Sequence, residues 1–109
     1  MPTLPAGRDL YVIQMAVTGD VKVGRSSNIE KRMAQLQVGA PHPLRLILRA
    51  PGLGQREREM HHKLRHYRTR QKAGEWFTEA CLGELPLEIY DLIPMDFLEN
   101  PDWWKRPSG

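Results

Sequence analysis

The sequence is poor in cysteine and has no long apolar run. Cys81 is its one cysteine, which excludes an internal disulfide and a cysteine-based zinc site. A helix that crosses a membrane needs about 20 apolar residues. The apolar runs here are only a few residues long, so we expect no membrane partner. Residues 1–5 also lack the basic stretch and apolar run of a secretion signal, which predicts a cytoplasmic protein.

Internal repeats are absent as well, and the length allows one domain. The chain has 109 residues, and domains commonly have about 50 to 200. Hydrophobic residues make up 40% of the chain and charged residues 27%, a balance typical of globular proteins. Without a disulfide or a cysteine-based metal site, packing must stabilise this fold.

Charge is distributed unevenly along the chain. Residues 22–72 contain thirteen basic residues and three glutamates, a net charge of +10, whereas the residues from 75 onward carry −6. A strongly basic segment attracts phosphate backbones through the release of counterions. The same charges also fit a solvated surface that the acidic C-terminal segment balances, and charge alone does not decide between the two.

Several stretches have the pattern of β-strands. Residues 10–15 and 21–23 are rich in β-branched residues and flank a turn at 17–20, which predicts a β-hairpin. In residues 44–49 each leucine is followed by an arginine or an isoleucine, an alternation that predicts a third strand with one buried face. Residues 75–78 predict a short strand or a clamp onto the core.

Two helices are predicted around the third strand. Apolar residues at helical spacing indicate a first helix over about 28–38, and Ser27 and Glu30 have the spacing of a capping box at its start. A second apolar stripe indicates a helix over about 55–67.

Five side chains of types that take part in catalysis lie on these elements. Tyr11 belongs to the first strand and Lys22 to its hairpin partner. Arg32 borders the apolar stripe of the first helix, and Glu57 borders that of the second. His61 lies four residues after Glu57, one helical turn further along the same face.

With these residues the chain resembles the GIY-YIG endonuclease superfamily, in the branch whose second motif reads Lys-Ile-Gly. The letters DLY, ending at Tyr11, stand in place of GIY, and KVG, starting at Lys22, stands in place of YIG. The stretch GRSSNIEKR leads to Arg32 as the family pattern does, and EREMHHKLRHYR and GEWF resemble the second helix and the closing segment.

The resemblance covers roughly residues 9–82 and implies an α/β fold. That fold is a small, three-stranded, mainly antiparallel β-sheet flanked by α-helices. It divides the chain into an N-terminal tail of residues 1–8, a nuclease domain of residues 9–82 and an acidic, proline-rich C-terminal extension of residues 83–109.

The activity implied is hydrolysis of DNA phosphodiester bonds with a divalent metal, Mg²⁺ or Mn²⁺. Glu57 would hold the metal, and Arg32 would neutralise charge on the scissile phosphate. Tyr11 and Lys22 would face each other across the hairpin and orient or deprotonate the attacking water. His61 would position Glu57, bind a phosphate or transfer a proton.

Each of these residues also has a structural interpretation. Glu57 fits a salt bridge within its helix, and Arg32 fits a surface phosphate contact or a pair with Glu30. Tyr11 fits strand packing, Lys22 an exposed strand position, and His61 a packing role.

DNA, in branched or nicked forms among others, is the partner that the resemblance implies, and RNA stays an alternative substrate. The expected phosphate contacts are Arg25, Lys31, Arg45, Arg49, Lys63 and Arg68. Because the sequence shows no separate DNA-binding module, we expect the chain to use its own basic face, form a homodimer or recruit a partner protein.

Two features differ from the superfamily pattern, and two other functions remain open. The GEWF segment has no counterpart of the usual closing asparagine, and Leu36 stands where some members carry a histidine. The alternatives are a non-catalytic nucleic-acid-binding module of the same fold and a protein-interaction domain. In the latter, the acidic tail with Trp103 and Trp104 would engage a partner or cover the basic face.

Overall fold

The computed structural model describes residues 8–69 and 75–105, and all structural statements below concern these residues. The predicted N-terminal tail and the glycine of GEWF lie outside them. Within the described ranges, no helix is both long and apolar enough to span a membrane.

A three-stranded antiparallel sheet forms the centre of the fold. Its strands are β1 (Asp9–Met15), β2 (Val21–Ser26) and β3 (Leu44–Ala50), in the order β2-β1-β3. The α-helices are α1 (Ile29–Gly39), α2 (Glu57–Lys63), α3 (Leu87–Tyr90) and α4 (Met95–Glu99). Short 3₁₀ segments are η1 (Gly54–Arg56), η2 (Arg65–Tyr67), η3 (Glu79–Glu84) and η4 (Trp103–Lys105). This arrangement confirms the predicted α/β fold class.

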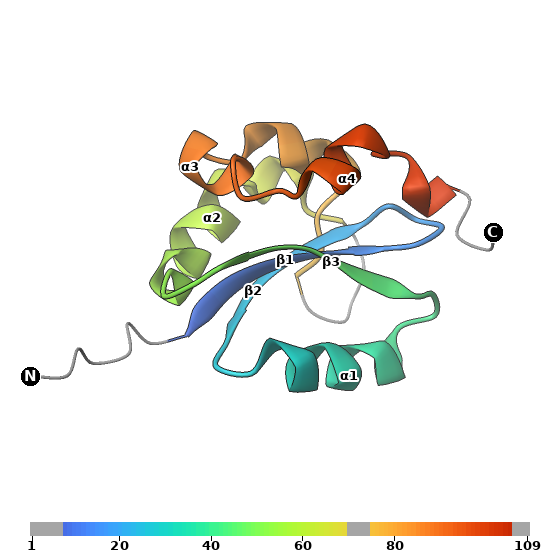
Figure 1. Cartoon of the computed structure of the whole chain (residues 1–109), viewed down its shortest axis with the longest axis horizontal. Helices are drawn as coiled ribbons and strands as arrows, with labels where there is room; N and C mark the ends of the chain where they lie inside the picture. The colour runs from blue at the N-terminus through green and yellow to red at the C-terminus, as the bar shows by residue number, and fades with distance from the viewer. Residues whose placement is uncertain (1–7, 70–74, 106–109) are drawn as a thin grey trace, which may run out of the picture.

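The central strand β1 is buried on both faces. Its alternating side chains Tyr11, Ile13 and Met15 pack with Ile29 of α1 in one apolar cluster. Leu10 and Val12 point to the other face and join a cluster with α2 and the C-terminal segment. Figure 1 shows α1 on one side of the sheet and α2, α3 and α4 on the other.

Strand β3 also contributes to both faces, so the prediction of one buried face was wrong. A β-bulge opposite Val12 and Ile13 shifts the pairing by one residue, from Leu48 to Leu46. Leu44 and Leu46 therefore pack beside the α1 cluster, whereas Ile47 and Leu48 belong to the cluster on the opposite face.

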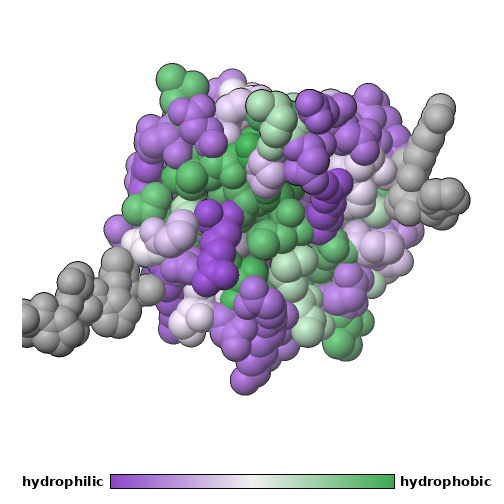
Figure 2. All heavy atoms as spheres, in the orientation of Figure 1, coloured by the Kyte–Doolittle hydropathy of each residue, from purple (hydrophilic) through white to green (hydrophobic). Residues whose placement is uncertain are grey.

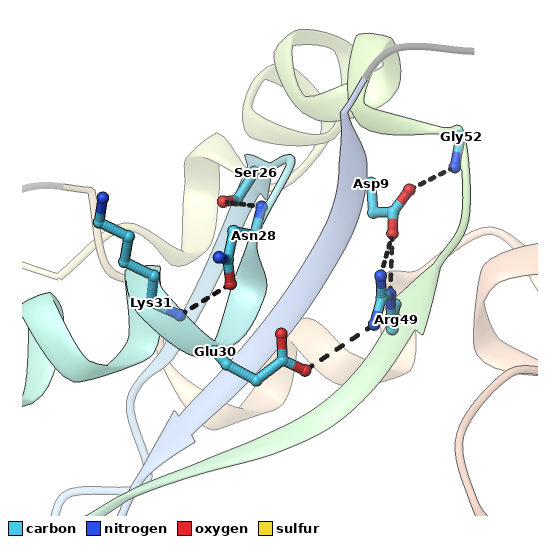
Figure 3. A network of polar contacts seen from close by, with 7 residues as sticks. All are labelled: Asp9, Ser26, Asn28, Glu30, Lys31, Arg49 and Gly52. Atoms are coloured by element: carbon cyan, nitrogen blue, oxygen red, sulfur yellow. Dashed lines mark hydrogen bonds and ion pairs between the residues drawn. The ribbon is translucent and has the colours of Figure 1, made fainter. Parts of the chain in front are cut away.

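Helix α1 begins with an asparagine cap in place of the predicted capping box. The Asn28 side chain accepts a hydrogen bond from the backbone N–H of Lys31 at 3.1 Å, and Ser26 Oγ accepts from the Asn28 N–H at 2.9 Å. Glu30 extends toward Arg49 of β3, 3.9 Å away, so it does not close a box with Ser27 (Figure 3).

The helix predicted over 55–67 is divided into η1, α2 and η2. Its apolar stripe is as predicted, since Met60 and Leu64 are fully buried on the sheet. The 3₁₀ segments at both ends tighten the chain around a short α-helix of seven residues.

Residues 75–78 form the predicted clamp. The Phe77 N–H donates to the Val21 carbonyl and the Val21 N–H donates to the Phe77 carbonyl, both at 2.7 Å. Because β2 is an edge strand, this bridge occupies part of its free edge. Phe77 is fully buried, and the clamp also pairs with Arg68.

The C-terminal segment is part of the core. Leu85, Ile89, Ile93 and Phe97 are buried in the same cluster as Val12 of β1. The segment ends on the β1–β2 hairpin, where the Trp103 indole N–H donates to the Gln14 side chain at 2.9 Å.

Trp104 completes this docking. Its carbonyl accepts from the Val17 N–H at 2.8 Å, and its ring covers Gly19, where an added Cβ would lie 2.9 Å from ring carbons. Trp103 and Trp104 therefore anchor the C-terminal segment on the β1–β2 hairpin.

Candidate active site

Tyr11 and Gly24 form the floor of the candidate site. Tyr11 is directly opposite Gly24 in the strand register, and a Cβ at Gly24 would lie 2.3 Å from both the ring Cζ and the hydroxyl oxygen of Tyr11. Any larger residue would therefore displace the tyrosine ring. Lys22 pairs with Ile13, so the prediction that Tyr11 and Lys22 face each other was wrong. They lie diagonally on the same face of the sheet.

Lys22 is partly buried above an aromatic ring. Its Nζ lies 5.9 Å from the centroid of the Trp76 ring, within the range of a cation–π contact. Burial lowers the pKa of Lys22 below that of an ordinary lysine, and the nearby Arg32 charge lowers this pKa further. Glu57 and Glu75 oppose the shift, which places all three of these charges within electrostatic reach of Lys22.

Arg32 is exposed on α1, although the stripe pattern predicted an inward position. Its guanidinium donates to Gln35 at 3.4 Å within the same helix. Only Ile29 of α1 is fully buried, because the helix contacts the sheet through a narrow stripe. Arg32 is thus accessible to a ligand while its charge still reaches Lys22.

Glu57 begins α2 at the free edge of β2. Its Oε1 lies 3.4 Å from Nε of Arg25, which follows Gly24 on that strand, and its side chain is 27% exposed. This pair differs from the salt bridge within the helix that the sequence suggested. It links the carboxylate on α2 directly to the strand that carries Lys22.

His61 is held between a carbonyl and a carboxylate. Its Nε2 lies 2.7 Å from the Val23 carbonyl, and its Nδ1 contacts the Glu75 carboxylate. Glu75 in turn pairs with Arg68 at 3.1 Å. Since both ring nitrogens face acceptors, the geometry favours the positioning and packing roles of His61 over direct proton transfer with a substrate.

Some of these groups line a pocket of about 630 Å³ at the edge of β2. The side chains that line it are polar or charged: Arg25, Gln55, Glu57, Arg58, His61 and Glu75. Tyr11, Lys22 and Arg32 are not among the lining residues. A wide polar pocket lined by two arginines and two glutamates suits a charged, hydrated ligand.

Comparison with known proteins identifies the family. A family model described as the T5orf172 domain matches residues 10–92, more than half of the chain. The chain belongs to the T5orf172 domain family. This family is related to endonuclease-type folds of phage and bacteria, and membership indicates a nuclease or nucleic-acid-binding role. No curated protein and no solved structure matches the chain.

The T5orf172 match includes α3 and thus continues beyond residue 82, where the sequence suggested that an extension begins. Leu85 and Ile89 lie in this part of the match and belong to the core. The family match and the hydrophobic core thus both include this segment.

The T5orf172 domain offers one carboxylate that fits a divalent metal. Among the described residues, no three side chains of the types His, Cys, Asp and Glu are grouped as a metal site. Mg²⁺ is often bound through one or two carboxylates, with water and substrate phosphate as its other ligands. Glu57 suits this mode because its carboxylate lines the pocket and pairs with Arg25 alone among the described residues, whereas the Glu75 carboxylate contacts both His61 and Arg68.

The expected DNA contacts do not form one surface. Arg45 pairs with Asp96 at 3.2 Å and lies over the rings of Phe97 and Trp103, so it fixes the C-terminal segment. Arg49 pairs with Asp9 at 2.8 Å (Figure 3). Both guanidinium groups thus pair with carboxylates of their own chain, and their role as DNA contacts stays a prediction.

The other four expected contacts lie elsewhere. Arg25 and Arg68 pair with the two pocket carboxylates, and Lys31 and Lys63 are exposed without an ion pair among the described residues.

Three pocket residues of this T5orf172 domain were not among the predicted site residues. Gln55 and Arg58 lie close to Glu57 in sequence. No sequence pattern distinguishes them from ordinary surface residues. Glu75 does carry one, since it is the acidic residue of the GEWF segment that was matched to the family pattern.

Proposed function

We propose that this protein is a GIY-YIG-type endonuclease that hydrolyses DNA phosphodiester bonds with Mg²⁺ or Mn²⁺. The main support is the geometry around β2, where Glu57 of α2 pairs with Arg25 of β2 at 3.4 Å. The charges of Glu57 and of Arg32 on α1 both act on Lys22 of the same strand. The resemblance in sequence motifs and the family's relation to endonuclease-type folds agree with it.

In the proposed reaction, a P–O bond forms from a water oxygen and the P–O bond to the leaving nucleoside breaks. Arg32, being exposed, would contact a non-bridging oxygen and balance the developing charge. Lys22 would accept the proton of the attacking water, a role that its lowered pKa favours. Tyr11 would orient that water from the floor of the site.

Glu57 would hold the divalent metal, which supplies charge stabilisation at the phosphate when bound. Its carboxylate opens into the pocket, where Arg25 and Arg58 are available to bind the flanking phosphates. His61 and Glu75 would fix α2 against β2 and so set the position of Glu57 relative to Lys22.

A nucleic-acid-binding module that does not cut is the second candidate. It is favoured by the lack of a cluster of three metal-binding side chains in residues 8–69 and 75–105 and by the pair between Arg25 and Glu57. Such a module would bind nucleic acid through the same basic side chains, without a metal.

Cleavage of plasmid, branched and single-stranded DNA with Mg²⁺ or Mn²⁺ tests the proposal. We expect the native chain to cut and EDTA to stop cutting. Glu57→Gln should lower the rate at least about 100-fold, as expected for loss of a charge-stabilising group, with DNA binding retained. Glu84→Gln, an exposed carboxylate outside the pocket, is the matched control and should cut normally. Salt-dependent binding without cleavage by any variant would favour the binding module.

A further inference from the structure

Exposed hydrophobic side chains are concentrated on the C-terminal segment. Of the large hydrophobic residues that are exposed in the described part of the chain, only Val17 and Val38 lie elsewhere. The others form what we term the C-terminal apolar surface: Leu87, Tyr90, Leu92, Met95 and Leu98. Concentrated exposed apolar area of this kind marks interaction sites in soluble proteins.

A groove opens in this surface between η3, α3 and α4. It has a volume of about 190 Å³, with walls that include Leu82, Tyr90, Ile93, Phe97 and Leu98. A cavity of about 150 Å³ holds a benzene molecule, so the groove has room for one large apolar side chain. On the side of the molecule where α3 and α4 lie, Figure 2 shows hydrophobic residues at the surface among hydrophilic ones.

One carboxylate lines the groove, and three more are adjacent in sequence to residues that line it. Glu79 lines it, and Glu84, Asp91 and Glu99 directly follow the lining residues Gly83, Tyr90 and Leu98 in sequence. None of these four carboxylates forms an ion pair within residues 8–69 and 75–105. By contrast, Glu88 and Asp96 of the same segment pair with Arg56 and Arg45. The groove thus combines an apolar interior with the unpaired carboxylate of Glu79, in a segment that carries an excess of acidic residues.

We propose that this groove is the docking site for a basic segment of a partner protein that inserts a large apolar side chain. The apolar interior selects the inserted side chain, and the carboxylates select the surrounding lysines or arginines. Nucleic acid does not fit, because the same carboxylates repel phosphate.

A second copy of the chain is a poorer occupant. Its other exposed hydrophobic residues, Val17 and Val38, have no lysine or arginine within three residues on either side. Neither valine therefore offers, within its own stretch of sequence, the basic and apolar combination that the groove requires.

The docking site is separate from the pocket at the edge of β2. The two share no lining residue, since residues of η3, α3 and α4 line the groove, whereas the pocket is lined by Arg25, Gln55, Glu57, Arg58, His61 and Glu75. A partner can therefore be bound while nucleic acid occupies the pocket. The inference stands whether or not the protein cuts DNA.

Binding of a short, fluorescein-labelled helical peptide with leucines on one face and lysines on the other tests the proposal. We expect saturable binding by the full chain in fluorescence anisotropy, and no binding of the same peptide with glutamates in place of lysines. Leu98→Arg, which places a cation at the groove, should weaken binding at least about tenfold, equivalent to about 1.4 kcal/mol.

Val38→Arg is the matched control, since Val38 is exposed on α1, remote from the groove in sequence and not among its lining residues. It should bind the lysine peptide like the native chain. Circular dichroism should show that both variants are folded. A Glu79→Lys, Glu99→Lys variant should lose the same binding without any change in the apolar walls.

Equal binding of both peptides, or equal weakening by Leu98→Arg and Val38→Arg, would overturn the proposal. Sedimentation equilibrium of the native chain supplies a further check. A dimer that Leu98→Arg dissociates would overturn it in favour of a second copy as the occupant, and a monomer supports it.

Discussion

At the residue scale, Gly24 is required by the tyrosine ring that lies across it. Gly24→Ala would place a Cβ 2.3 Å from Tyr11, and the ring has no free space on the buried α1 face. We expect a loss of stability of about 1–3 kcal/mol, the usual cost of overpacking a core. Gly39→Ala is the control, because a Cβ there meets nothing within 4 Å. Chemical denaturation compares the two variants, and equal midpoints would contradict this interpretation.

A second residue-scale prediction concerns Lys22 and Arg32. Burial is the main cause of the lowered pKa of Lys22, and the Arg32 charge adds to it. Arg32→Gln should therefore raise this pKa toward the ordinary value of 10.5 without restoring it fully. NMR titration of the Lys22 side chain measures the shift directly. Lys31→Gln, which removes the neighbouring charge on α1, serves as the control and should leave the titration nearly unchanged.

The sign of the pKa shift also sets the expected pH profile. If neutral Lys22 accepts the proton from water, the cleavage rate rises with pH until Lys22 has lost its proton. Because the pKa is lowered, this rise should be complete below the pH at which an ordinary lysine titrates. A rate that is independent of pH through this range would assign the base elsewhere.

At the element scale, His61 and Glu75 connect α2 to β2. Glu75→Gln replaces the carboxylate that contacts Nδ1 of His61, and His61→Ala removes the donor to the Val23 carbonyl. We expect both variants to lower the rate of DNA cleavage while protein folding and DNA binding persist, because Glu57 loses its fixed position. Glu79→Gln, on a carboxylate outside the pocket, should not change the rate.

Activity alone does not distinguish positioning from a direct role. The ¹⁵N chemical shifts of the His61 ring report its hydrogen bonds and should change in Glu75→Gln even if no variant cuts DNA. Unchanged shifts would mean that the contact between His61 and Glu75 is not formed in solution.

The elements themselves were largely predictable, and their details were not. The hairpin, third strand, clamp and both apolar stripes follow from local periodicity. The bulge in β3 could not be seen, because a shift in register depends on packing against both α1 and the C-terminal segment. The cap at Asn28 was missed for a similar reason, since Ser27 competes as a capping residue and Glu30 is drawn to Arg49.

The candidate site, like the fold, could be predicted only in part from the sequence. Motif order predicted which residues to examine, and the charges of Arg32 and Glu57 both act on Lys22. Motif order could not predict the pairs of Arg45 with Asp96 and of Arg49 with Asp9, because these partners lie far away in sequence.

At the scale of the whole molecule, the C-terminal segment is needed for folding. Each fully buried apolar side chain contributes about 1.5–3 kcal/mol. The loss of Leu85, Ile89, Ile93 and Phe97 would therefore remove about 6–12 kcal/mol, similar to the total stability of a domain. Removal of residues 84–109 should unfold the protein, and not simply uncover a basic face. Circular dichroism tests this, and Leu87→Ser, at an exposed position, should leave the fold intact.

Cys81 offers a probe of the same packing. It is fully buried, and burial raises the pKa of its thiol to about 12, with a smaller contribution from Glu79. Because the thiolate is the reactive form, the folded protein should resist thiol reagents at neutral pH and react rapidly once unfolded. Rapid reaction of the native chain would show that the C-terminal segment opens readily.

The contact between Gln14 and Trp103 links the central strand to a residue 89 positions later. Gln14 is fully buried, and without Trp103 its side-chain oxygen has no donor among the described residues. During synthesis β1 emerges early, yet its environment is complete only after Trp103 has left the ribosome. A nascent chain that has not yet reached Trp103 therefore lacks the donor to Gln14, so the environment of the central strand is completed by residues translated long after it.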